Sequence, residues 1–185
     1  MIPASLDAVD STTFAEKTFE VFEMVFDVDG GGSTITVKVS MQRDNTLVIK
    51  DLDVEVNNRR SENIENKDDL KDLSPGDSLA ANLKIKNDYN NDDDVDINDV
   101  EAELTCENDD SIDIQDETLD YGDVAPEDDD TDIFQIDIED DAPDDDSKCT
   151  IELSGKDDNG AFMGESLEFT IEVTRRNHDI SVRNI

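Results

Sequence analysis

The chain has 185 residues, of which 52 are acidic and 15 are basic, so that its formal net charge is −37. Such a charge excludes nucleic acid as a partner, because too few cations are present to neutralise phosphates. The sequence also lacks any run of 18 apolar residues, which excludes a membrane-spanning helix. The length allows one large domain or two small ones.

The acidic residues are concentrated in the middle of the chain. Between Lys86 and Lys148 there are 28 acidic residues and no basic one. A domain with this charge repels itself, and high salt, bound divalent cations or a basic partner can relieve the repulsion. The first ten residues, "MIPASLDAVD", have neither a basic start nor an apolar stretch typical of an export signal. If the protein is exported, we expect this sequence to be a mature form or a piece of a longer chain.

Residues 1–46 form an extension with its own pattern. Acidic residues recur there at spacings of four, three and four, which is typical of a helix: Glu16, Glu20, Glu23 and Asp27. Thr13 and Glu16 fit a capping box, and the glycines at 30–32 would end a helix. The many Val and Phe residues favour a strand instead. We favour a helix over 13–28, with a strand as the alternative, followed by a strand over 33–41.

The remainder of the chain has the pattern of a sheet with one buried face. Seven segments alternate apolar and polar residues with a period of two: 47–56, 77–87, 99–106, 111–116, 132–140, 148–155 and 166–173. Short strands without intervening helices predict a seven-stranded antiparallel β-sandwich. We therefore expect a mainly β protein with an extension over 1–46, a sandwich over 47–176 and a tail, or the start of a further repeat, over 177–185.

Two stretches resemble a known family. "LSPGDSLAANLKIKND" (73–88) is similar to the opening of the CARDB-like and archaeal S-layer-associated immunoglobulin-like repeats, and 119–160 is similar to the remainder of such a repeat. "HDISV" (178–182) resembles the start of a following repeat. The resemblance implies an immunoglobulin-like sandwich in a prokaryotic cell-surface protein with a structural or adhesive role. The chain departs from the family in its acidity, since "APEDDD" and "APDDD" stand where small residues are usual.

The only two cysteines lie on the predicted buried face. Cys106 ends the third predicted strand and Cys149 begins the sixth, and these strands are antiparallel neighbours in an immunoglobulin-like sandwich. A disulfide between them is therefore expected, with two buried free thiols as the alternative. The disulfide would indicate an oxidising compartment.

Three acidic loops are expected to meet at one end of such a sandwich. Carboxylates that converge on one point are what Ca²⁺ requires. The candidate ligands are Asp92, Asp93, Asp94, Asp128, Asp129, Asp130, Asp157 and Asp158. The alternative is a set of solvated turns surrounded by a diffuse ion atmosphere. No cofactor is required by the sequence, and Ca²⁺ is the candidate.

No arrangement of residues in the sequence is typical of an enzyme, and the lone His178 has no evident partner. The sequence favours a non-enzymatic, extracellular building block of an S-layer, filament or stalk. Its expected partners are other copies of itself or other surface proteins, reached by strand exchange. The candidate assembly residues are Phe14, Phe19, Phe22 and Phe26. One alternative is a Ca²⁺-dependent adhesin or ligand-binding domain, and a third is an acidic intracellular chaperone-like or decoy protein with free thiols.

Overall fold

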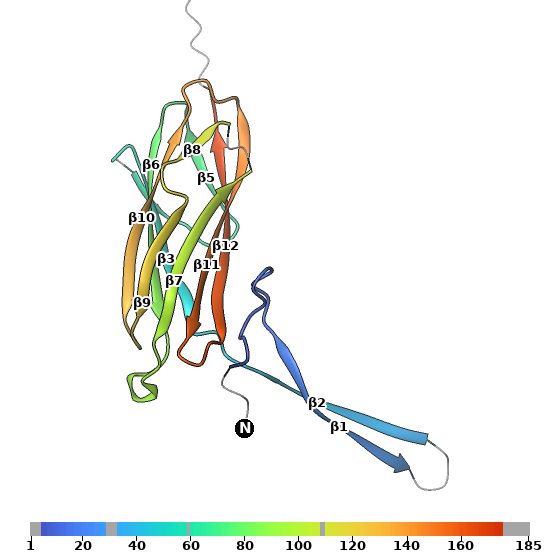
Figure 1. The fold of residues 1–185 in the computed structure, drawn as a ribbon. Coiled ribbons are helices and arrows are strands. Elements are labelled where there is room, and N and C mark those ends of the chain that lie inside the picture. Colours follow the sequence, from blue (N-terminus) through green and yellow to red (C-terminus); the bar gives the residue numbers. More distant parts are fainter. Residues whose placement is uncertain (1–4, 29–32, 59, 108–109, 176–185) are drawn as a thin grey trace, which may run out of the picture.

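The computed structural model describes residues 5–28, 33–58, 60–107 and 110–175, and it consists of a β-sandwich from which a two-stranded hairpin projects (Figure 1). The tail predicted over 177–185 lies outside the described residues. Within these ranges, no helix is long and apolar enough to cross a membrane.

The hairpin consists of β1 (Thr18–Val28) and β2 (Ser33–Gln42), which form a sheet of their own. The helix favoured for 13–28 is therefore wrong, and the alternative strand is correct. The helix-like spacing in the sequence arises from a β-bulge at Val21, between Glu20 and Phe22. The extra residue shifts the alternation by one, so residues three apart come to share a face as they would on a helix.

The sandwich contains ten strands in two five-stranded sheets. They are β3 (Leu47–Val56), β4 (Arg60–Asn63), β5 (Asp68–Leu73), β6 (Ser78–Asn87), β7 (Ile97–Cys106), β8 (Ile112–Ile114), β9 (Thr118–Val124), β10 (Asp129–Ile138), β11 (Asp145–Asp157) and β12 (Phe162–Val173). One sheet has the order β4-β3-β6-β10-β8 and the other β5-β12-β11-β7-β9. A short 3₁₀ helix, η1 (Asn91–Asp93), follows β6.

The seven predicted strands correspond to β3, β6, β7, β8, β10, β11 and β12. Their arrangement, β3-β6-β10-β8 against β12-β11-β7, is the immunoglobulin order of strands A-B-E-D against G-F-C. The mainly β, immunoglobulin-like sandwich is thus confirmed. Three strands add to it: β4 and β9 extend the sheets antiparallel to their neighbours, and β5 pairs in parallel with β12.

The core lies between the two sheets and follows the predicted alternation. Buried side chains occupy every second position of β6, of β7 from Val100 onward and of β10 from Phe134 onward: Leu79, Ala81, Leu83 and Ile85; Val100, Ala102 and Leu104; Phe134, Ile136 and Ile138. Each fully buried large aliphatic or Phe side chain stabilises the fold by about 1.5–3 kcal/mol. The acidic residues between them therefore face water, which is how this chain combines a core with its charge.

Candidate functional site

The hairpin carries an apolar face that nothing in the described part of the chain covers. Residues directly opposite each other in a two-stranded sheet share a face. Four such cross-strand pairs are apolar on both strands: Phe19 with Met41, Phe22 with Val39, Met24 with Val37, and Phe26 with Ile35. The bulge at Val21 is what brings Phe19 onto the same face as Phe22. These eight side chains are called the apolar face below.

The opposite face of the hairpin is mostly polar. Glu23 lies opposite Lys38 and Glu20 opposite Ser40. The Lys38 ammonium lies 3.0 Å from the Glu20 carboxylate and 3.9 Å from that of Glu23. Val25, opposite Thr36, is a large apolar residue within this face. The hairpin is therefore amphipathic, with its charges gathered on one side.

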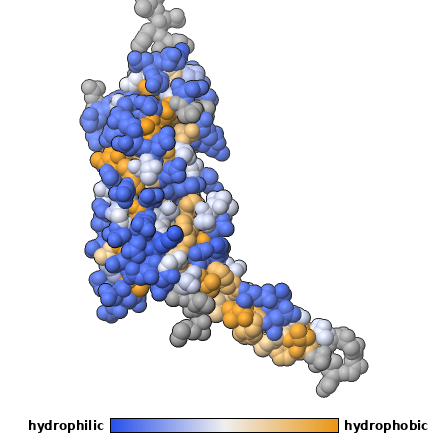
Figure 2. Space-filling model, in the orientation of Figure 1, coloured by the Kyte–Doolittle hydropathy of each residue, from blue (hydrophilic) through white to orange (hydrophobic). Residues whose placement is uncertain are grey.

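Exposure of large apolar side chains is concentrated on the hairpin. Among the residues that the structure describes, nine large hydrophobic side chains are exposed, and eight of them belong to β1 or β2. Those on the hairpin are Val21, Phe22, Met24, Val25, Phe26, Ile35, Val37 and Met41. Figure 2 shows this apolar surface along the hairpin, whereas most of the visible sandwich surface is hydrophilic. Apolar patches of this kind are typical of interaction sites in proteins, so we treat this surface as the candidate site.

Of the four predicted assembly phenylalanines, two are exposed on the hairpin. Phe22 and Phe26 are exposed, and Phe19 is half-buried. Phe14 lies before the hairpin and packs against Phe162 at the start of β12, with ring centroids 6.0 Å apart. Phe14 therefore fixes the hairpin to the sandwich.

The segment that leads into β1 is bound to the start of β12. The Ala8 N–H donates to the Phe162 carbonyl, and the Phe162 N–H donates to the Asp7 carboxylate at 3.0 Å. Lys17 forms an ion pair with the same carboxylate at 2.9 Å. The Phe162 N–H and the Lys17 ammonium hold the pKa of Asp7 below its usual range. These bonds thus hold the segment before the hairpin against the sandwich.

The segment that follows β2 is anchored by a buried ion pair. The Arg43 guanidinium contacts the carboxylate of Asp157, whose side chain is fully buried at the end of β11. The same guanidinium donates to the Tyr89 hydroxyl at 2.7 Å. The other Asp157 oxygen accepts the N–H groups of Asn159 and Ala161, both at 2.9 Å. Arg43 therefore joins the hairpin to the turn between β11 and β12.

The three acidic loops meet at one end of the sandwich, as predicted from the sequence. The Asp158 N–H donates to the Asp96 carbonyl, and Asn91 donates to the Glu127 carboxylate. Several of the candidate calcium ligands already have partners in the protein. Asp157 binds Arg43, and Asp158 accepts from the Asn98 amide and the Asp96 N–H, which lower its pKa.

The candidate ligands on β10 are similarly engaged. Asp129 accepts from Lys84 at 2.9 Å and from Lys50 at 3.3 Å, and Lys84 contributes most to lowering the pKa of Asp129. Asp130 bonds the N–H of the next residue, Thr131. Asp92, Asp93, Asp94 and Asp128 are exposed. In the described ranges, no three His, Cys, Asp or Glu residues are grouped so as to hold a metal ion. The calcium site stays a prediction.

The predicted disulfide is present. Cys106 and Cys149 lie directly opposite each other on β7 and β11 and are joined by a disulfide, with Cα atoms 4.1 Å apart. The bond links adjacent strands of one sheet and closes a loop with a sequence separation of 43 residues. Both sequence-predicted positions are therefore correct.

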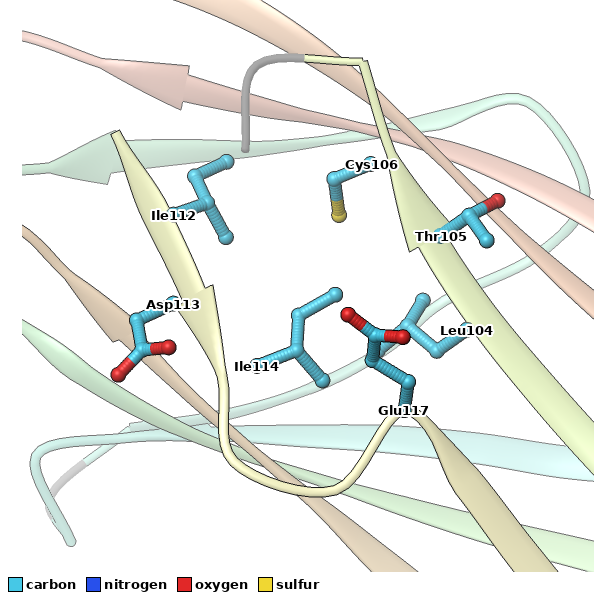
Figure 3. A pocket seen from close by; sticks show the side chains of 7 residues that line it. All are labelled: Leu104, Thr105, Cys106, Ile112, Asp113, Ile114 and Glu117. Carbon is cyan, nitrogen blue, oxygen red and sulfur yellow. The ribbon is translucent and has the colours of Figure 1, made fainter. Parts of the chain in front are cut away.

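A hollow of about 230 Å³ lies beside this disulfide, between β7 and β8. Ile112 and Ile114 of β8 point toward Leu104 and Cys106 of β7 across it (Figure 3). Glu117, Asp113 and Thr105 complete the lining. With its sulfur held in the disulfide, Cys106 offers no nucleophile, and we assign no chemistry to this hollow.

Comparisons with known proteins establish neither a family nor a function for this chain. No protein-family model matches the chain, and no curated protein matches it. Among solved structures, the chain is similar to the C-terminal domain of wzt, with 12% identity, a TM-score of 0.45 and coverage of 77% of this chain and 86% of that one. It is also similar to Spo0M, a sporulation control protein from Bacillus subtilis, with 14% identity, a TM-score of 0.34 and coverage of 67% and 50%. These likenesses are too distant to transfer a function, and the CARDB-like family is not shown by them.

Proposed function

We propose that this chain is a non-enzymatic structural module of a prokaryotic cell surface, a building block of an S-layer, filament or stalk. It assembles with other copies or with other surface proteins through the hairpin over 18–42. The observation that carries the proposal is the exposure of large apolar side chains on β1 and β2 beside an otherwise acidic surface.

The physical basis is the weakness of an isolated hairpin. A two-stranded hairpin is at best marginally stable in water, and three strands or a packed face are needed for independent stability. Phe22 and Phe26 are 48% and 50% exposed, so each presents about 100 Å² of surface to solvent. Burying about 200 Å² is worth on the order of 5 kcal/mol. A partner on this face would therefore stabilise the hairpin as well as form an assembly.

The disulfide supports the proposed location outside the cell. Disulfides persist in oxidising compartments and are rare in the cytosol. The Cys106–Cys149 bond is therefore consistent with an extracellular module, and it disfavours the alternative with two free thiols. The high negative charge suits a medium rich in salt or divalent cations, where it is screened.

The CARDB-like resemblance over 73–88 and 119–160 supports the same role, because repeats of that kind are structural parts of surface proteins. The strand-exchange version of assembly uses the free edges of β1 and β2, which could add to an edge strand of a neighbouring sandwich. Edge strands are available, since β4, β8, β5 and β9 end the two sheets.

The test shortens the hairpin and keeps its base. Thr18 and Gln42 lie directly opposite each other, so a two-residue Asn-Gly turn can replace residues 19–41. This variant retains the contacts of Asp7, Phe14 and Arg43 with the sandwich. We expect the full chain to form assemblies in light scattering and electron microscopy, and the shortened chain to remain monomeric with an unchanged melting temperature. Equal assembly of both proteins would contradict the role of the hairpin.

A further inference from the structure

The apolar face has a composition that restricts what it can bind. Its eight side chains are Phe, Met, Val and Ile, with no charged or polar group among them. The hairpin reaches away from the acidic sandwich (Figure 1). A suitable partner is therefore a second apolar surface of similar length and width, rather than a charged or hydrogen-bonding one.

The sandwich of a second copy does not offer such a surface in the described ranges. Ile133 on β10 is the one exposed large hydrophobic residue there outside the hairpin. Its neighbours Asp132 and Thr131 are polar and exposed. Within a second copy, the surface that matches the apolar face is the apolar face itself.

The area of the face is sufficient for a specific dimer. Six of its eight residues are between 36% and 55% exposed. Together the eight side chains present on the order of 600 Å², taking Phe at about 100 Å² and the others at somewhat less. Two faces would bury on the order of 1,200 Å², which is the lower limit of a stable, specific interface.

The length of the hairpin reduces the repulsion between two acidic bodies. β2 has ten residues, so the hairpin extends about 34 Å. The screening length at physiological ionic strength is about 8 Å. Two hairpins that overlap along their length can therefore hold the sandwiches several screening lengths apart. A direct contact between sandwiches would lack this separation.

We propose that two copies of this chain pair their hairpins face to face about a two-fold axis near Met24 and Val37, one of the two central cross-strand pairs of the apolar face. The product is a four-stranded, two-layered β-structure with the apolar faces about 10 Å apart and the Glu20, Glu23 and Lys38 side chains outside. The inference rests on the proposed function and names the partner of the same surface.

The test compares two valines of the same hairpin. Val37 lies on the apolar face, and Val25 lies on the opposite face and is the more exposed, at 59% against 40%. The substitutions Val37→Lys and Val25→Lys change the net charge equally, and both reduce the negative charge. Sedimentation equilibrium of the full chain should show a dimer. We expect Val37→Lys to weaken dimerisation about 100-fold, because each dimer loses two buried valines. Val25→Lys should change it less than about threefold.

A cross-linking measurement gives a second readout, which reports which face of the hairpin lies next to the second copy. The two cysteines of the chain are joined to each other, so an introduced cysteine is the one free thiol in the sequence. A short bis-maleimide should link Val37→Cys into covalent dimers and should leave Val25→Cys monomeric, since position 25 faces away from the partner.

Three results would overturn the face-to-face dimer. In the first, the full chain and Val37→Lys assemble equally well, whereas the shortened-hairpin chain does not assemble. The hairpin would then act through the edges of its strands, and the proposed function would stand. If the full chain is monomeric at every concentration in 0.15 M and 3 M NaCl, assembly with copies fails as well. If it is monomeric but sediments with phosphatidylcholine vesicles in a Val37-dependent manner, a lipid surface is the occupant.

Discussion

Replacing Arg43 with alanine should destabilise the whole sandwich and not only the hairpin. The Arg43 guanidinium, 15% exposed, is the cationic partner of the fully buried Asp157 carboxylate. It also donates to the Tyr89 hydroxyl and, at 3.4 Å, to the Leu6 carbonyl. Its loss leaves a buried carboxylate without a countercharge at the turn between β11 and β12. The turn itself depends on that carboxylate through the N–H groups of Asn159 and Ala161.

The expected magnitude follows from the burial. Removing one partner of a buried ion pair costs about 3–5 kcal/mol, whereas an exposed pair contributes about 0–1 kcal/mol. Asp157 keeps four hydrogen bonds from neutral donors in the variant, from the Tyr89 hydroxyl, the Ala161 N–H, and both the N–H and the side-chain amide of Asn159, which places the cost near the lower limit. For a chain of this length, a loss of about 3 kcal/mol corresponds to a decrease of about 6–12 °C in the melting temperature.

Urea unfolding monitored by circular dichroism measures this cost, with Lys50→Ala as the matched control. Lys50 pairs with Asp129 at 3.3 Å, but its side chain is 48% exposed, so its removal should cost less than about 1 kcal/mol. Arg43→Lys should fall between the two, because it keeps the charge but cannot reach three acceptors at once. A loss below about 1 kcal/mol for Arg43→Ala would refute the reasoning, since the pair would then behave as an exposed one.

Three further outcomes are expected. Replacing Cys106 and Cys149 by alanine should lower the free energy of unfolding by about 4 kcal/mol in the chain-entropy model, measured by urea unfolding. Ser78 and Gln115 donate to Asp137 and hold the pKa of its carboxyl below the usual range. These two hydrogen bonds therefore stabilise the fold fully above the unfolded pKa of about 3.9, and the stabilisation is lost as the pH falls through the lower folded pKa. Asp137→Asn should therefore shift the urea midpoint at pH 5 and much less at pH 3. If the acidic loops bind Ca²⁺, a Ca²⁺ concentration 100-fold above the dissociation constant should raise the free energy of unfolding by about 2.7 kcal/mol relative to an NaCl control of equal ionic strength. Equal melting temperatures in Ca²⁺ and in NaCl would show that the salt acts by general screening.

The alternation of apolar and polar residues was sufficient to predict the main strands. Seven segments obey it, and their order along the chain gives the immunoglobulin arrangement. The additional strands β4, β5 and β9 do not obey it. In β5, Leu70 and Leu73 are buried although they are three residues apart, because the register with β12 shifts between Ile171 and Val173. A single sequence does not reveal such a shift, since it depends on the neighbouring strand.

The hairpin was mistaken for a helix for a related reason. Phe19 and Phe22, and likewise Glu20 and Glu23, are three residues apart and share a face through the bulge at Val21. A bulge in a strand and a turn of helix leave the same local spacing, so the sequence pattern was ambiguous. The content of Val and Phe was the better guide, because β-branched and aromatic residues fit a pleated surface.

The anchoring of the hairpin could not be predicted from local patterns. Arg43 and Asp157 are 114 residues apart, and in sequence Asp157 is one of several acids in an acidic loop. We interpreted that loop as a cation site, and the cation that the structure places at Asp157 is the Arg43 guanidinium. The signal that could have identified this pair is the scarcity of bases, because each base in so acidic a chain must lie close to carboxylates.

Several of the few basic residues lie beside particular carboxylates. Arg43 compensates the buried Asp157, Lys84 and Lys50 both contact Asp129, and Lys38 lies between two glutamates of the hairpin. Each of these cations thus compensates one or two nearby carboxylates. Most of the acidic surface is left without a compensating charge. Two sandwiches therefore repel each other over their surfaces, except where a contact is uncharged and lies far from both bodies. The apolar face of the hairpin meets both conditions. In the proposed dimer, the charge that opposes general aggregation would therefore leave this face as the surface of association.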